Sequence, residues 1–174
     1  MHNLQNIALY YIAIGEVNGV KVDAKVDAKV RTKNVNQNRT QYWGISVDTN
    51  VVLNHPEIFI PKELGLVPNK DMHTTLLFVG GKASNEYDEH IDKECTMAVV
   101  GYGYSDKALA LEVGEVLFAD TEEPVKSHAV KQHITVALAK GTKAVDSVKT
   151  LLGEATMVRK FVEPIILHGK LRRY

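Results

Sequence analysis

Two short segments of the chain carry a histidine two positions before a threonine. The first pair is His73 with Thr75, and the second is His133 with Thr135. In an extended chain, residues two apart point to the same face, so each pair presents an imidazole beside a hydroxyl. Two imidazoles on opposite sides of a phosphodiester can act as general base and general acid near neutral pH, because the ordinary pKa of histidine is about 6.5. The spacing therefore indicates acid–base chemistry on a phosphate.

A three-residue pattern also arises by chance, so its surroundings matter. Both motifs lead into a purely apolar run, 76–79 in the first case and 136–139 in the second, and a glycine follows each run. This is the pattern of two buried strands that enter turns. None of the other five histidines has this context. The shared context favours a functional pair over two unrelated histidines at strand edges.

With these two motifs the chain resembles the 2H phosphoesterase superfamily, which is defined by two His-x-Thr or His-x-Ser strands. Family members commonly carry a glycine-rich strand and a partner strand between the motifs. Here Val99-Val100-Gly101-Tyr102-Gly103-Tyr104 precedes Ala108-Leu109-Ala110-Leu111-Glu112-Val113. A helix and a final strand follow the second motif in similar order. The resemblance covers residues 42–174, whereas the first forty residues have no counterpart and no predicted function.

The resemblance also implies a fold. Intermixed strands and helices by themselves favour an α+β domain with mainly antiparallel sheets. A 2H phosphoesterase-like fold would be bilobal, with two sheets related by a pseudo-two-fold around a central cleft, and each lobe would contribute one motif strand. Because 174 residues with 45% apolar composition suffice for one core, we expect a single domain over residues 1–174.

Further elements are predicted from local pattern. The segment 42–47 has strand character and is expected to continue at 51–53 after a turn. A helical turn is expected at 61–65, where proline precedes and glycine follows. The other expected elements are a strand at 6–15, a surface helix at 22–30, a loop at 34–40, loop and short helix at 82–94, a helix at 145–152 that stops at Gly153, and a closing strand at 164–171.

The resemblance implies a metal-independent reaction in which one histidine accepts the proton of a ribose 2'-hydroxyl and the other protonates the departing 5'-oxygen. Thr75 and Thr135 would donate hydrogen bonds to non-bridging phosphate oxygens, and the assignment of base and acid between His73 and His133 stays open. No cofactor is expected. There is no His-Glu-x-x-His motif, and the acidic run before His90 lies in a polar stretch typical of a solvated face.

Aromatic side chains are the usual platforms for nucleobases. The substrate-binding candidates are Tyr11, Tyr42 and Trp43. Core packing is the alternative for each of them. Tyr42 and Trp43 follow a polar loop, which would allow one of them to line a cleft.

Within the superfamily, the chain is most similar to phage anti-CBASS phosphodiesterases, on the evidence of segments 73–80, 101–111 and 133–138. That similarity implies cleavage of 3',5'-bonds in cyclic di- or trinucleotide immune signals, such as 3',3'-cGAMP, through a 2',3'-cyclic phosphate. The enzyme would thereby antagonise a host defence. Two alternatives stay open: a 2',3'-cyclic phosphodiesterase of RNA repair, and a non-catalytic sponge that sequesters cyclic nucleotides.

Composition limits the partners. Twenty-one basic and twenty-one acidic residues leave no net charge, which favours a small anionic substrate over long nucleic acid. Cys95 is the only cysteine and lies beside an apolar run, so we expect a buried structural thiol rather than a nucleophile. No apolar run approaches the roughly 20 residues of a membrane span. We therefore expect a cytoplasmic protein, in the host cytoplasm if the gene is a phage gene, and leave its oligomeric state open.

Overall fold

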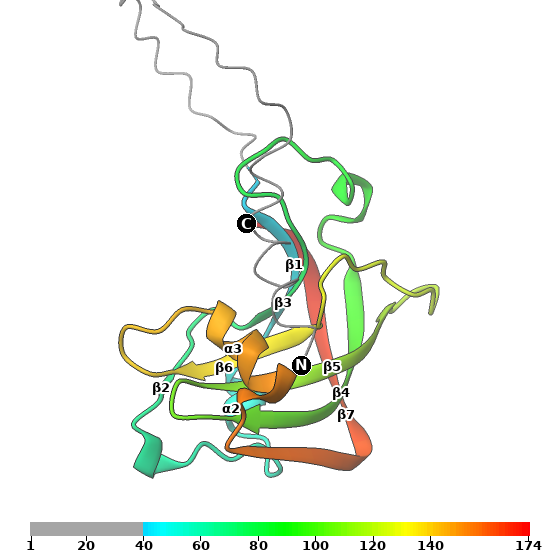
Figure 1. The fold of residues 1–174 in the computed structure, drawn as a ribbon. Coiled ribbons are helices and arrows are strands. Elements are labelled where there is room, and N and C mark those ends of the chain that lie inside the picture. The colour runs from blue at the N-terminus through cyan, green and yellow to red at the C-terminus, as the bar shows by residue number, and fades with distance from the viewer. Residues whose placement is uncertain (1–39) are drawn as a thin grey trace, which may run out of the picture. The chain divides into compact units, whose positions relative to one another are not determined.

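Seven β-strands dominate residues 40–174, the part of the chain that the computed structural model describes (Figure 1). The expected elements at 6–15 and 22–30, most of the expected loop at 34–40, and Tyr11 lie outside this part. The strands are β1 (Tyr42–Val47), β2 (Val67–Pro68), β3 (His73–Phe78), β4 (Glu94–Tyr104), β5 (Ala108–Phe118), β6 (His133–Leu138) and β7 (Met157–Arg173).

The strands join into one antiparallel sheet whose order is β2-β6-β3-β1-β7-β4-β5. Strand β5 also pairs with β6, so six strands form a closed barrel and the two-residue β2 is an additional strand on β6. The expected bilobal fold with two sheets was therefore wrong. The two motif strands are neighbours in the same sheet, because Thr74 of β3 pairs with Ile134 of β6.

Helices are few in the described residues, which corrects the expected α+β class to a mostly β fold. The two α-helices, α2 (Thr49–Leu53) and α3 (Val145–Lys149), have five residues each. Single turns occur at η1 (Lys62–Leu64), η2 (Asp88–His90) and η3 (Thr150–Glu154), the last of which continues α3. Across the described range, no helix combines the length and apolar character needed to cross a membrane.

The core fills the inside of the barrel with apolar side chains from several strands. Ile45, Leu76, Met97, Leu111 and Ile134 come from five different strands and are all completely buried. Removing such apolar side chains from water is the main driving force for closing the sheet, at about 25 cal/mol per Å². Cys95 is buried in this core as expected, and burial raises the pKa of its thiol to about 11.

Local signals in the sequence located most elements. Strand β1 has the expected bounds, and η1 lies at the expected turn between Pro61 and Gly65. The expected strand at 51–53 was wrong, because these residues belong to α2. The carboxylate of Asp48 accepts a hydrogen bond from the backbone N–H of Asn50 at 2.8 Å, which caps the first turn of this helix.

Strand β7 is longer than expected and turns a corner within its length, visible where the ribbon bends sharply in Figure 1. Val99 of its partner β4 pairs with Ile165, and Gly101 of β4 pairs with Lys160. Two positions along β4 thus correspond to five positions along β7. Residues 161–164 therefore project from the pairing, and the side chain of Val162 is completely exposed.

We expect Ile134→Ala to lower the free energy of unfolding by about 2–5 kcal/mol, because it removes buried methyl groups where β3, β5 and β6 meet. Val162→Ala is the control and should change stability by less than about 0.5 kcal/mol. Urea denaturation monitored by tryptophan fluorescence measures both. Equal effects of the two substitutions would contradict the packing described above.

Candidate active site

The two His-x-Thr motifs meet across the β3–β6 pair. Because the strands are antiparallel and Thr74 lies opposite Ile134, the register places His73 opposite Thr135 and Thr75 opposite His133. Thr74 and Ile134 point into the core, so the motif residues share the other face. Each imidazole thus has a threonine beside it on its own strand and another across the pair.

Each imidazole is held by the same backbone contact. Nδ1 of His73 donates a hydrogen bond to the carbonyl oxygen of Asp71, and Nδ1 of His133 donates to that of Lys131, both at 2.9 Å. A carbonyl only accepts, so Nδ1 carries the hydrogen in both rings. Proton exchange is left to Nε2. The same contact thus occurs at both motifs: the carbonyl two residues before each histidine fixes the tautomer of the ring.

Burial shifts both rings toward the neutral form. It lowers the pKa of His73 below the ordinary value, although the bond to the Asp71 carbonyl opposes the shift. The pKa of His133 is lowered by burial and, after the opposing bond to the Lys131 carbonyl, by the charge of His73. This repulsion indicates that the two imidazoles lie close enough for the charge of one to affect the pKa of the other.

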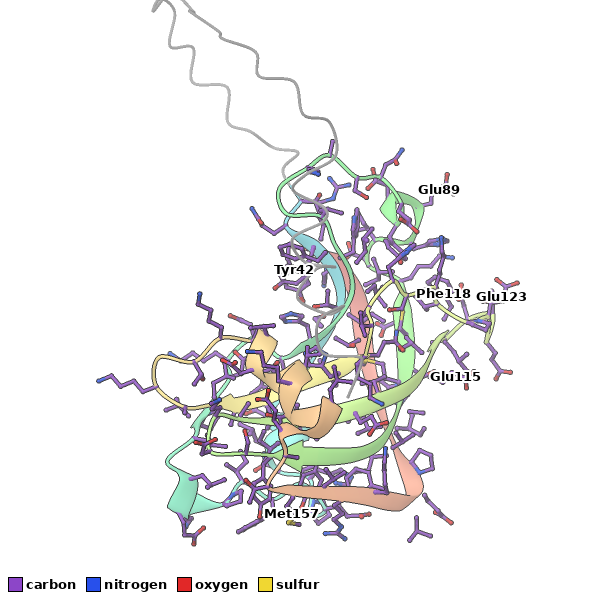
Figure 2. All side chains as sticks on the ribbon, viewed as in Figure 1. Tyr42, Glu89, Glu115, Phe118, Glu123 and Met157 are labelled. Atoms are coloured by element: carbon purple, nitrogen blue, oxygen red, sulfur yellow. The ribbon has the colours of Figure 1, made fainter. Side chains whose placement is uncertain are left out.

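An aromatic cluster surrounds His73. The ring of Tyr42 stacks on His73, with centroids 4.8 Å apart and planes 21° apart, and on Tyr174 at 4.6 Å and 13°. Tyr174 also approaches His73 at 5.1 Å. In Figure 2, Met157, where β7 begins, lies at the bottom of the view, and Tyr42 lies well above it. Sequence reasoning missed Tyr174, because only the β1–β7 pairing brings it to the motif.

Gly44 makes room for this arrangement. It pairs with Thr75 on β3, and a Cβ at this position would stand 2.7 Å from the carbonyl oxygen of Thr74 and 3.6 Å from Cδ2 of His73. The first distance is too short for any side chain, so β1 and β3 would have to separate. Glycine therefore permits the close approach of β1 to the first motif.

The other predicted substrate-binding residues lie elsewhere. Trp43 follows Tyr42 on β1 and so points to the opposite face, where it is completely buried against Tyr87 and under Arg173. A nucleobase could reach it only by displacing the core. Tyr11 lies outside the described residues. Of the three candidates, Tyr42 alone is placed at the motifs by the structure.

No group of three or more histidine, cysteine or carboxylate side chains with metal-binding geometry occurs among residues 40–174. Residues of the acidic run at η2 make contacts with other side chains of the protein. Asp88 forms an ion pair with Arg173, and the ring of His90 contacts that of Phe118 with centroids 4.8 Å apart. Metal independence remains a prediction.

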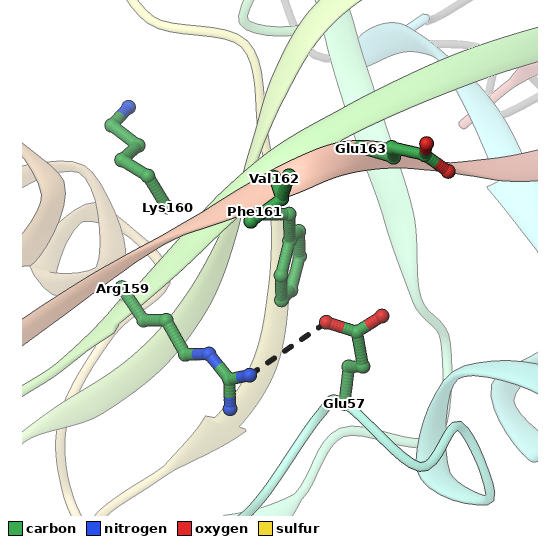
Figure 3. A pocket seen from close by; sticks show the side chains of 6 residues that line it. All are labelled: Glu57, Arg159, Lys160, Phe161, Val162 and Glu163. Carbon is green, nitrogen blue, oxygen red and sulfur yellow. Dashed lines mark ion pairs between the residues drawn. The ribbon is translucent and has the colours of Figure 1, made fainter.

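A pocket of about 330 Å³ opens on another part of the surface, at the corner of β7 (Figure 3). Phe161 and an ion pair between Glu57 and Arg159, at 3.7 Å, form much of its lining. None of the motif residues lines this pocket.

Comparisons with known proteins give a likeness of fold. No protein-family model matches the chain, and no curated protein matches it in sequence. The chain is similar to the crystal structure of a fungal RNA kinase, with a TM-score of 0.50 and 15% sequence identity. The match covers 80% of this chain and 46% of that one, so the chain spans about half the length of the protein it matches. At this level of sequence identity the likeness concerns the fold alone.

We expect His73→Ala to raise the pKa of His133, because the substitution removes a repelling charge and exposes the remaining ring to water. An NMR titration of the imidazole resonances measures the shift. His128→Ala is the control and should leave the pKa of His133 unchanged, since His128 lies outside both motifs and its ring contacts Glu86. An unchanged pKa in His73→Ala would contradict the coupling of the two rings.

Proposed function

We propose that the protein is a metal-independent phosphodiesterase of the 2H type that cleaves 3',5'-bonds in cyclic di- or trinucleotides. The observation that carries the proposal is the antiparallel register that joins two Nδ1-anchored histidines and two threonines on one face. Attack of a neighbouring hydroxyl on a phosphodiester requires a general base, a general acid and hydrogen-bond donors to the phosphate. The two Nε2 atoms and the two threonine hydroxyls can supply these groups.

The reaction would proceed in one displacement at phosphorus. Nε2 of one neutral histidine takes the proton of the ribose 2'-hydroxyl, and the 2'-oxygen attacks the adjacent phosphorus. The P–O5' bond breaks, and Nε2 of the other, protonated histidine gives its proton to the departing 5'-oxygen. The products are a 2',3'-cyclic phosphate and a 5'-hydroxyl, which are linked in one opened molecule when the substrate is a ring.

Thr75 and Thr135 would bind the non-bridging oxygens during this step. Within residues 40–174, neither hydroxyl makes a hydrogen bond to another protein group. Both are thus available as donors to the negative charge that develops on the phosphate. Tyr42 and Tyr174, whose rings lie against His73, are described aromatic residues placed to contact a base.

By the resemblance to anti-CBASS phosphodiesterases, the biological role would be to open the cyclic signals of a host defence. A second candidate is a 2',3'-cyclic phosphodiesterase of RNA ends, which is favoured by the likeness to a fungal RNA kinase. The same histidines would serve that reaction. A sponge that binds without turnover is the non-enzymatic alternative.

Purified protein in excess chelator should open 3',3'-cGAMP, as followed by chromatography of the products. His133→Ala should reduce the rate by at least about 100-fold, the usual contribution of a general acid or base. His168→Ala, an exposed histidine on β7, is the matched control and should retain full activity. Turnover of 2',3'-cyclic AMP alone would favour the RNA-end enzyme, and binding without turnover would favour the sponge. Activity abolished by chelator and restored by metal would refute the mechanism.

The pH profile of kcat/KM should be bell-shaped, because one histidine must be neutral and the other protonated. Since burial lowers the pKa of both rings in the free enzyme, the optimum should lie below the ordinary histidine value of about 6.5. Initial rates at low substrate concentration across pH 4–9 test this expectation, and an optimum above about 7.5 would be inconsistent with it.

A further inference from the structure

Two lysine ammonium groups converge on one carboxylate next to the second motif. Glu112 of β5 is the direct cross-strand partner of His133. Nζ of Lys131 lies 2.5 Å from one oxygen of Glu112, and Lys160 forms an ion pair with the other. The Glu112 side chain is only 13% exposed, whereas those of Lys131 and Lys160 are 30% and 59% exposed. The cluster therefore presents two cations outward around one shielded anion.

The backbone brings Lys160 to this point from two strands away. Lys160 of β7 pairs with Gly101 of β4, and Gly101 pairs with Glu112 of β5. A Cβ at Gly101 would stand 2.4 Å from the carbonyl oxygen of Arg159 and 3.1 Å from Cδ of Lys160. Only glycine fits there, and the Lys160 side chain passes over it to reach Glu112.

Neighbouring Arg159 takes no part in this cluster. Figure 3 shows Arg159 and Lys160 leaving β7 on opposite sides, with Arg159 directed to Glu57. The alternation of a strand explains the difference, because successive side chains point to opposite faces. Lys160 thus shares a face with Gly101, Glu112 and His133, all of which are linked by direct pairing.

The cluster can bind an anion. Each ammonium group has three N–H donors, and the carboxylate of Glu112 engages one from each lysine. Donors remain on both lysines, and two positive charges against one negative charge leave an excess of one. Because Glu112 pairs directly with His133, this excess charge is held beside the cross-strand neighbour of the second motif's histidine.

We propose that Lys131 and Lys160, held in place by Glu112, form a subsite for a second phosphate of the substrate. The inference rests on the proposed function and narrows its substrate class. A cyclic dinucleotide carries two phosphates one ribose apart, so one can occupy the motifs while the other meets the lysines. A 2',3'-cyclic mononucleotide has a single phosphate and leaves the subsite empty.

The test compares Lys160→Gln with Arg159→Gln, the adjacent ion-paired cation on the other face. Calorimetry uses the His73→Ala/His133→Ala protein, in which turnover cannot interfere, with cyclic di-AMP and 2',3'-cyclic AMP as ligands. We expect Lys160→Gln to weaken binding of cyclic di-AMP by about tenfold or more, the loss typical of one charge-assisted hydrogen bond. Binding of 2',3'-cyclic AMP should change by less than about twofold, and Arg159→Gln should affect neither ligand.

The outcomes separate the subsite from the proposed function. Equal weakening of both ligands by Lys160→Gln would overturn the subsite, because it would place the lysine at the single phosphate of the motifs. No weakening of either ligand would also overturn it. Failure of the wild-type protein to cleave cyclic dinucleotides, with selective weakening still present, would refute the phosphodiesterase and leave the subsite intact. Lys160→Arg keeps the positive charge and should bind cyclic di-AMP as the protein with Lys160 does. Weak binding by Lys160→Gln alone would therefore reflect the lost charge and not a loss of folding.

Discussion

The pairing of Thr74 with Ile134 is the contact on which the rest of the structure depends. It joins β3 to β6, closes the ring of strands, and decides which histidine faces which threonine. Both side chains are completely buried. A shift of one residue along either strand would move these side chains to the surface and the imidazoles into the core, which is a strong penalty against any other register. The apolar core and the site are therefore specified by the same pairing.

Two opposing effects act on the imidazoles at this junction. Burial favours the neutral rings, whereas the carbonyl oxygens that accept from Nδ1 favour the charged rings. The balance keeps Nε2 of both groups available for proton exchange. A phosphate anion between the rings would stabilise a proton on either one, because opposite charge raises the pKa of a histidine. Binding of the substrate would itself complete the acid–base pair.

Sequence patterns predicted the parts of the molecule that depend on near neighbours. The strand character of residues 42–47, the proline and glycine around η1, and the apolar runs after His73 and His133 each identify an element locally. The closure of the sheet could not be predicted in this way, because it depends on strands far apart in the chain. Tyr174, Glu112 and Lys160 were missed for the same reason. The sequence could have predicted that only one of Tyr42 and Trp43 lines the site, because adjacent residues of a strand face opposite sides.

The carbonyl anchors of the two histidines also bear on how the site can change during evolution. Positions 71 and 131 hold residues of opposite charge, aspartate and lysine, and yet supply the same contact. Every amino acid carries a main-chain carbonyl, so substitution at either position preserves the tautomer of the ring. The local charge can then vary while the geometry stays constant. Mutation at position 71 thus offers a route to retune the proton transfer of His73 alone, whereas replacement of Lys131 would also remove its ion pair with Glu112.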